Sequence, residues 1–583
     1  MANHKSSNLT DILSTLWTEC QGNTARFLAG AYPQAEAHPA ALEVSEALAW
    51  LNTTGAGANL RPLRVHLIAN FITQGLAEPL ELLLILLGIN PTIVFHPPYQ
   101  FQAEPTDAEV VVLLIDYEKF RDAAGRQDLA ILGDWLARIK SHAPAATLLL
   151  NEPFFLPPAP VVEPEHAVAQ RRGDEERVAG LAAEFSAILI HWNGPLHELG
   201  TAVAHRTSHY LHYDQLFTRA GLGVIAKVLA RTLAAIFTPR KKVLCLDADN
   251  TLWQGIVGED GPDGVLYQPD TPRGRCFHRV LQQIKHHSDE GVLLAIVSKN
   301  NESAVLEVLA RPDFPLKRED FAALRINWQP KSQNLREIAE ELNLGLDAFV
   351  FVDDSEFELA EVQAAIPEIT VSQVPKRAED YPALLGSSPS FDRIRITKED
   401  RTRKQEYRAQ TERRRMQAEE PGSFLQRLQI IVRVQPTSAD EVSRVAQLFM
   451  KTNQFRFTAA RPGSEEVRAW LNDARRQVLS VYYRDIFGDS GMIGAAMLER
   501  GHGDWCLRNM VMSCRVIGRG VEDALLAVWA RRFRPLKIDF EDSGRNKVAE
   551  LALRRCGWHH GEVLIPPAIP DSIEIIQTEA PEV

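Results

Sequence analysis

The spacing of apolar and polar residues predicts helices near the start of the chain and alternating strands and helices after it. Apolar residues recur on one helical face between Ile12 and Cys20, so residues 1–60 are expected to form an N-terminal helical arm. From Leu63 onward short apolar runs at 65–68, 92–95, 110–115 and 147–150 alternate with helical stretches. This alternation is typical of a parallel sheet with helices on both faces, and it defines a first α/β region at 61–237.

Two further regions follow the first. At 238–387 the runs 243–246, 292–297 and 348–352 are continuously apolar and end at polar residues, as buried parallel strands do. The segment 388–427 is expected to be a basic helical linker, because 398–415 holds eight basic and four acidic residues. Region 428–565 mixes strands and helices, whereas 566–583 has four acidic and no basic residues and is expected to be a loose acidic tail. The predicted fold class is therefore α/β and multidomain.

Composition narrows the class of protein. The 583 residues are 45% hydrophobic and 24% charged, which is ordinary for a globular chain and excludes a disordered one. A net charge of −12 argues against a dedicated nucleic-acid binder. Six cysteines without a CxxC pair argue against a disulfide scaffold or a zinc ribbon. The longest apolar run, 82–89, is too short to cross a membrane. The expected compartment is the cytoplasm.

The strongest chemical signal follows the strand at 243–246. Asp247 and Asp249 lie just beyond its end, where α/β proteins commonly bind ligands. Two carboxylates at this spacing can converge on a cation, one acting as nucleophile and the other as acid and base. Alone, the pair is a weak signal, because acidic residues after a strand often only cap the next helix.

Three more features occur in the order that a phosphoryl-transfer site needs. Ser298 ends the next strand and offers a hydroxyl to a phosphoryl oxygen, and Lys331 precedes a helix, where its ammonium can neutralise phosphate. Asp353 and Asp354 then follow a third strand. Oxygen ligands without Cys or His favour Mg²⁺ as the cofactor.

The intervals between these residues are short. Ser298 lies 49 positions after Asp249, and Lys331 lies 33 positions after Ser298. One helix with its turns uses most of either interval, so neither leaves room for a sizeable cap domain. An open site suits a macromolecular partner, unless the flanking regions of the chain act as a lid.

These four motifs resemble those of the haloacid dehalogenase (HAD) superfamily, and the longer motifs resemble its subfamily IIIC, the FkbH-like branch. The resemblance spans roughly residues 60–565. It is carried by these segments: Asp247-Ala-Asp-Asn-Thr-Leu-Trp-Gln-Gly-Ile-Val-Gly-Glu-Asp-Gly261, Val297-Ser-Lys-Asn-Asn-Glu302, Asn327-Trp-Gln-Pro-Lys-Ser-Gln-Asn334, Lys451-Thr-Asn-Gln-Phe455 and Ser513-Cys-Arg-Val-Ile-Gly-Arg-Gly-Val-Glu522. Gln254 departs from the family pattern, which has Gly there.

The resemblance implies an activity. FkbH-like proteins take a glyceryl unit from 1,3-bisphosphoglycerate, remove phosphate and load the unit on the phosphopantetheine arm of an acyl carrier protein for polyketide biosynthesis. It implies that Asp247 is the nucleophile and Asp249 the general acid and base, and that Ser298 and Lys331 hold the phosphoryl oxygens. Mg²⁺ would be held by Asp247, the Asp249 carbonyl and Asp354, with Asp353 in support.

The third region, 428–565, resembles the GNAT acyltransferase fold. Arg515, Gly518 and Gly520 match its pyrophosphate-binding turn, so they are candidates to bind pantetheine or coenzyme A. Cys514 precedes this turn and is a candidate to carry an acyl thioester, although a small buried structural residue is the simpler interpretation.

The first region, 61–237, resembles an SGNH hydrolase whose chemistry is missing. Asn70 and Phe71 stand where that fold has its nucleophilic Ser, so a non-catalytic scaffold is expected. Two alternatives remain for the whole chain. One is a HAD phosphatase that acts on a free phosphometabolite, and the other is a carrier-protein docking protein with vestigial catalysis.

Overall fold

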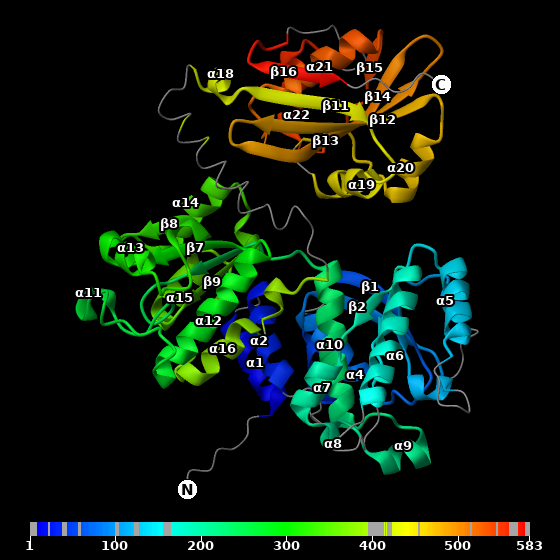
Figure 1. Ribbon diagram of the computed structural model, residues 1–583, viewed down its shortest axis with the longest axis vertical. Helices are drawn as coiled ribbons and strands as arrows, with labels where there is room; N and C mark the ends of the chain where they lie inside the picture. Colours follow the sequence, from blue (N-terminus) through cyan, green and yellow to red (C-terminus); the bar gives the residue numbers. More distant parts are fainter. Residues whose placement is uncertain are drawn as a thin grey trace. The chain divides into compact units, whose positions relative to one another are not determined.

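The structure is a computed structural model, and Figure 1 labels most of its helices and strands. It describes residues 8–20, 24–37, 44–55, 60–98, 104–121, 128–154, 165–386, 388–394, 413, 416, 423–452, 455–513, 516–543, 546–558 and 569–577. The chain divides into two compact units, Met1–Arg401 and Thr402–Val583. Two parallel sheets lie in the first unit and one mixed sheet lies in the second, which confirms the predicted α/β multidomain class.

The first sheet has the strand order β2-β1-β3-β4-β5, and all its strands are parallel. Its strands are β1 Arg61–Ala69, β2 Ile89–Phe95, β3 Val110–Leu114, β4 Thr147–Asn151 and β5 Ile188–Ile190. Helices cover both faces, because side chains of α4 and α10 share one apolar core and those of α5 and α6 share another. Its helices are α4 Ala77–Leu86, α5 Ala130–His142, α6 Glu165–Glu184, α7 Asn193–Leu199, α8 Thr201–Ala204, α9 Thr207–Tyr213 and α10 Arg219–Phe237, with a 3-10 turn at Tyr117–Phe120.

The N-terminal helices belong to the same core. They are α1 Leu9–Glu19, α2 Thr24–Ala37 and α3 Val44–Thr54. Leu9, Leu13 and Phe27 are buried together with residues of α4 and α10. The helices expected near the start of the chain are therefore present, but they pack onto the first sheet instead of standing apart as an arm.

By length and apolar composition, α10 is the one helix among the described residues that is able to cross a membrane. More than half of its most apolar stretch is buried inside the protein. It packs against α4 and α7, so its apolar composition is explained by its place in this core.

The second sheet has the order β10-β9-β6-β7-β8 and is also fully parallel. The three predicted strands are its centre, and β8 and β10 complete its edges. Its strands are β6 Val243–Leu246, β7 Leu293–Ser298, β8 Phe321–Ile326, β9 Phe349–Asp353 and β10 Thr370–Gln373. Its helices are α11 Val257–Asp260, α12 Pro272–Asp289, α13 Glu302–Ala310, α14 Lys331–Leu342, α15 Glu356–Ala365 and α16 Tyr381–Gly386, with 3-10 turns at Arg318–Asp320, Leu346–Ala348, Ala378–Asp380 and Pro389–Phe391.

The third sheet has the order β15-β14-β13-β12-β11-β16. The strands from β11 to β14 pair in antiparallel fashion, and the two edge strands pair in parallel. Its strands are β11 Ile430–Pro436, β12 Arg476–Asp485, β13 Gly488–Arg500, β14 Trp505–Met512, β15 Leu536–Ile538 and β16 Ile573–Gln577. Its helices are α18 Phe424–Leu428, α19 Val442–Lys451, α20 Ser464–Leu471, α21 Val521–Arg532 and α22 Lys547–Arg555.

Two expectations on this part of the chain need comment. The expectation that the acidic tail is loose throughout is wrong, because Ile573–Gln577 forms β16 and pairs with β11.

Most of the basic linker lies outside the described residues. Within it Arg413 is buried and donates to both carboxylate oxygens of Asp485, at 2.6 and 2.7 Å, so this one residue is bound to the third sheet.

Candidate active site

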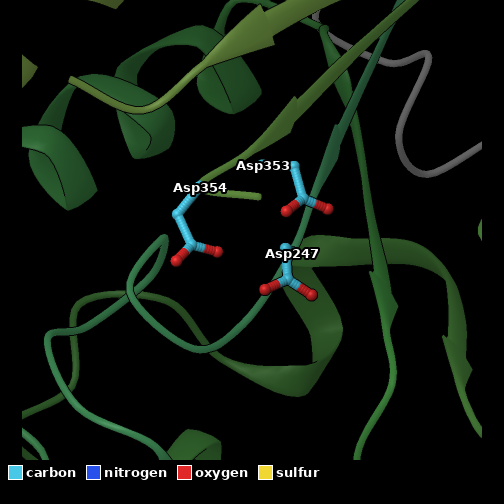
Figure 2. A group of neighbouring side chains, drawn as sticks. All are labelled: Asp247, Asp353 and Asp354. Atoms are coloured by element: carbon cyan, nitrogen blue, oxygen red, sulfur yellow. The ribbon is translucent and has the colours of Figure 1, made fainter. Parts of the chain in front are cut away.

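Three carboxylates meet at the carboxyl end of the second sheet. Asp247 follows β6 directly, and Asp353 and Asp354 come at the end of the neighbouring strand β9. The two strands are in register there, and the backbone N–H of Asp247 donates to the Val352 carbonyl at 3.0 Å. Figure 2 shows the three side chains facing one another, and one carboxylate oxygen of each lies within 4.8 Å of the others. Three of the four residues predicted to hold a cation are thus brought together.

Lys331 lies against this cluster as the first residue of α14. Its Nζ donates to Asp247 Oδ1 at 2.8 Å and to Asp353 Oδ2 at 2.6 Å, and all three residues are buried. Burial alone would lower the pKa of Lys331, but the two carboxylates raise it above its ordinary value. Burial and the charge of Asp247 raise the pKa of Asp353, although Lys331 opposes this. The lysine is therefore a cation that offsets part of the negative charge of the cluster.

Asp249 is held separately from the three carboxylates. Its Oδ1 accepts hydrogen bonds from Trp253 Nε1 at 2.9 Å and from the Val257 backbone at 3.0 Å, and its Oδ2 accepts one from Asn300 Nδ2 at 2.8 Å. Burial raises the pKa of Asp249 above its usual range despite these donors. The side chain is thus fixed in position and has a raised tendency to hold a proton, as an acid and base requires.

The chain turns sharply after Asp249. Asn250 has a left-handed backbone conformation, with φ 53°, and its side chain accepts a hydrogen bond from the Gly255 backbone at 3.1 Å. Gln254 and Leu266 exchange backbone hydrogen bonds at 3.0 and 2.9 Å. This segment, fully described between β6 and α12, contains the four-residue helix α11 and no separate cap domain. Gln254 itself lies outside the carboxylate cluster.

Ser298 ends β7, the strand on the other side of β6. It is buried, and its carbonyl accepts a hydrogen bond from the backbone of Asn327, which follows β8, at 3.0 Å. The next residue, Lys299, pairs with Glu358 of α15 at 2.6 Å. Ser298 therefore lies at the same edge of the sheet as the carboxylates, and its phosphate-binding role stays a prediction.

Asn300 is the main residue that sequence reasoning missed. It contacts Asp249 directly, and it lies two positions after Ser298 in the same run of polar residues. The motif at 297–302 predicts a functional loop, but the sequence alone does not show which of its side chains points toward β6. Trp253 was missed for a similar reason, because a buried Trp looks like a core residue until its indole N–H is seen to donate to Asp249.

A cavity of about 670 Å³ opens beside the cluster and shares Asp354 with it. Its charged lining is balanced, because Lys376 lies 3.5 Å from Glu356 and Arg377 lies 2.8 Å from Glu379. The full lining is Asn250, Gln254, Arg273, Phe277, Asp354, Glu356, Gln373, Val374, Pro375, Lys376, Arg377, Ala378, Glu379 and Tyr381.

Asn70, at the end of β1 in the first sheet, has a structural role. Its side chain donates to the Asp116 carbonyl at 3.0 Å and accepts from the Asp116 backbone at 2.6 Å, and it is buried. The Asp116 carboxylate accepts a hydrogen bond from Tyr210 at 2.9 Å. These hydrogen bonds fix Asn70 at the position where an SGNH hydrolase would have its nucleophilic Ser.

The candidate acyl-binding residues of the third region are only partly described. Cys514 and Arg515 lie outside the described residues. Gly518 and Gly520 precede α21 with φ values of 81° and 80°. The Gly518 N–H donates to the buried Glu522 carboxylate at 3.2 Å, so an anionic ligand at this turn would have to displace a carboxylate.

One solved structure is similar to this chain over more than half of its length. It is the N-terminal part of the protein BF1531 from Bacteroides fragilis, containing a phosphatase domain complexed with Mg, with a TM-score of 0.50 and 22% identity over 58% of this chain and 96% of that one. A GDSL-like lipase from Parabacteroides merdae (16% identity, 29% of this chain and 95% of that one) has a TM-score of 0.22. An uncharacterized protein from Corynebacterium glutamicum (13% identity, 25% and 95%) has a TM-score of 0.18.

The last two scores are too low to support an argument about fold. No protein-family model matches the chain, and no curated protein matches it. The first likeness, at 22% identity, is one of fold: the chain contains the α/β fold of a phosphatase-domain protein.

Proposed function

We propose that the chain is a Mg²⁺-dependent phosphatase of the HAD type. The observation that carries this proposal is the cluster of Asp247, Asp353 and Asp354 with Lys331 between two of the carboxylates. Hard oxygen donors of this kind suit Mg²⁺, and the protein with the similar fold was crystallised with Mg. Bound there, Mg²⁺ would offset the negative charge of a phosphoryl group as a carboxylate approaches it.

The residues divide the work as follows. An Asp247 oxygen forms a bond to phosphorus while the bond from phosphorus to the leaving oxygen breaks. Asp249 gives its proton to that leaving oxygen and then takes one from the water that hydrolyses the aspartyl phosphate. Lys331 compensates the charge on Asp247, which otherwise repels the phosphoryl group. The raised pKa of Asp249 favours the first of its two roles.

The proposed substrate is a glyceryl unit derived from 1,3-bisphosphoglycerate. Its acyl phosphate is an activated donor: attack by the pantetheine thiol of an acyl carrier protein forms the thioester and releases phosphate. The phosphatase site then removes the remaining phosphate ester. This part of the proposal rests on the FkbH-like motifs, and it places the reaction in the cytoplasm, where carrier and metabolite meet.

The experiment that tests this proposal is an intact-mass measurement. The full chain is incubated with Mg²⁺, 1,3-bisphosphoglycerate and a pantetheinylated carrier protein. A carrier that gains the mass of a glyceryl group, with release of two phosphates per carrier, supports the proposal. A carrier of unchanged mass, with phosphate released from the metabolite alone, contradicts the transfer step.

A second candidate is a phosphatase that acts on a free phosphometabolite. The observation in its favour is the cavity of about 670 Å³ that shares Asp354 with the carboxylate cluster, which is large enough for a small substrate. Turnover of free phosphoglycerate at a rate equal to that of the carrier-bound unit would favour this candidate.

A further inference from the structure

Three arginines of the described part of the chain are buried, and all three lie in the second unit. Arg413 donates to both carboxylate oxygens of Asp485, and Arg519 Nη1 lies 3.8 Å from the same carboxylate. Arg456 is equally buried, with 7% of its surface exposed. Its Nε and Nη1 are buried without a hydrogen-bond partner, and no acidic side chain among the described residues forms an ion pair with it.

The backbone on both sides of Arg456 is held firmly. Residues 455–457 pair with the end of β14 through two backbone hydrogen bonds of 3.1 Å, and Arg456 and Val511 form the bridge between the two segments. Asn546 Nδ2 donates to the Arg456 carbonyl at 2.8 Å. The extended backbone therefore fixes the direction in which the Arg456 side chain leaves the sheet.

That direction is toward the face of the third sheet that α19 and α20 cover. Successive side chains of an extended segment point to opposite faces of a sheet. Phe455 and Phe457 are buried in the core that contains residues of α21 and α22. Val511, which is paired with Arg456, belongs to the other core, which contains residues of α19 and α20. Arg456 is thus directed among apolar side chains, which cannot satisfy a guanidinium group.

Two charged side chains act on Arg456, and their effects oppose each other. Burial lowers the pKa of Arg456 and the positive charge of Arg461 lowers it further, whereas the negative charge of Glu541 raises it. Glu541 Oε2 already accepts the Ala459 backbone N–H at 2.9 Å. Because arginine stays protonated in proteins, Arg456 is a buried cation whose charge is not balanced by an acidic residue of the described chain. Such a charge is costly until an anion pairs with it.

We propose that Arg456 binds the carboxylate group of a small organic acid at this face of the third sheet. A guanidinium with free N–H groups forms charge-assisted hydrogen bonds to an oxyanion. The charges of Arg461 and Glu541 offset each other, so one further negative charge balances the site. A carboxylate supplies one charge, whereas a phosphate group carries about two near neutral pH. This site lies in the second unit and does not depend on the proposed phosphatase function.

Calorimetric unfolding of the full chain tests the proposal, with acetate as the probe. Replacing chloride by acetate at constant ionic strength should raise the unfolding midpoint of the wild type by about 2 °C or more and leave Arg456→Met unchanged. In chloride, Arg456→Met should unfold at the wild-type temperature or above it, because it removes an unbalanced buried charge. The matched control is Arg413→Met, which is equally buried but should unfold at a lower temperature, because Asp485 loses its partner.

A second measurement needs no variant. The nuclear magnetic resonance signal of isotope-labelled acetate should broaden when the wild-type chain is added. Four outcomes overturn the site: no broadening of that signal, an acetate effect on the midpoint that persists in Arg456→Met, a larger midpoint shift with phosphate than with acetate, or a midpoint of Arg456→Met in chloride that falls as far as that of Arg413→Met.

Discussion

Lys331 Nζ lies 2.8 Å from Asp247 Oδ1, and the two residues are 84 positions apart in the chain. Both are buried, and the lysine also reaches Asp353 at 2.6 Å. Removing one partner of a buried charge pair leaves an uncompensated charge in a medium of low polarity. This contact therefore stabilises the carboxyl end of the second sheet. It also offsets part of the negative charge that would otherwise repel a phosphoryl group.

The first prediction concerns the nucleophile. Asp247→Asn keeps the volume of the side chain but removes its negative oxygen, so phosphate release should fall by at least about a thousandfold. Release of inorganic phosphate is the measurement, and circular dichroism shows whether the fold survives. The control is Asp263→Asn, a fully exposed residue of the same segment between β6 and α12. Turnover near the wild-type level in Asp247→Asn would show that this carboxylate only caps the turn.

The second prediction concerns the metal. Asp354 supplies one of the three converging carboxylates, so Asp354→Asn should raise the Mg²⁺ concentration for half-maximal activity by about tenfold or more. Glu356→Gln is the matched control, because Glu356 lines the same cavity but lies outside the cluster. Excess chelator should abolish phosphate release in the wild-type chain, and added Mg²⁺ should restore it. Full activity in chelator contradicts the assignment.

The third prediction separates Asn300 from its neighbour. Asn300 donates to Asp249 Oδ2, so Asn300→Ala should misplace the acid and base and lower kcat about tenfold or more with little change in KM. Asn301→Ala is the control, because Asn301 is the N-cap residue before α13 and its side chain makes no capping bond there. Equal effects of the two substitutions would indicate that the loop as a whole, and not this contact, affects the rate.

The centre of the second sheet was predictable because its strands are buried on both faces. β6, β7 and β9 read as continuous apolar runs, and each ends at or just before a polar residue at the carboxyl edge of the sheet. β8 was missed because it is an edge strand, only partly buried, in which Arg325 pairs with Glu337 and Glu341 of α14. Edge strands need such partners from elsewhere in the chain, and periodicity alone does not show them.

The side-chain contacts of the site were less predictable than its strands. The order of acidic and basic residues predicted which groups come together, since parallel strands place their carboxyl ends at one edge. It did not predict that Asn300 binds Asp249 or that Glu522 bonds to Gly518, because both contacts depend on the direction of a side chain after a turn. The tail strand β16 was missed because its short run gains stability only by pairing with β11.

The last prediction concerns the pH dependence of stability in the second unit. Burial raises the pKa of Asp485, but hydrogen bonds from Arg413 and Tyr483 outweigh this and hold it below its ordinary value. A carboxyl whose pKa is lower in the folded than in the unfolded chain contributes stability above its unfolded pKa of about 4, and this stability is lost as the pH falls through the folded value. Asp485→Asn should therefore lower the free energy of unfolding at pH 7 by about 3 kcal/mol, because Arg413 is left buried without its partner.

Thermal unfolding of the full chain by calorimetry, between pH 3 and pH 8, measures this difference. The difference in free energy of unfolding between wild type and Asp485→Asn should be constant above about pH 5. It should shrink toward pH 3, because the wild-type carboxyl takes up a proton as the pH falls. Asp489→Asn is the control, since this carboxylate lies in the same β12–β13 hairpin and accepts a hydrogen bond from the Gly491 backbone, at 2.7 Å, at an exposed position. If this difference in free energy is as large at pH 3 as at pH 7, the packing of the Asp485 side chain, and not its charge, holds Arg413 in place.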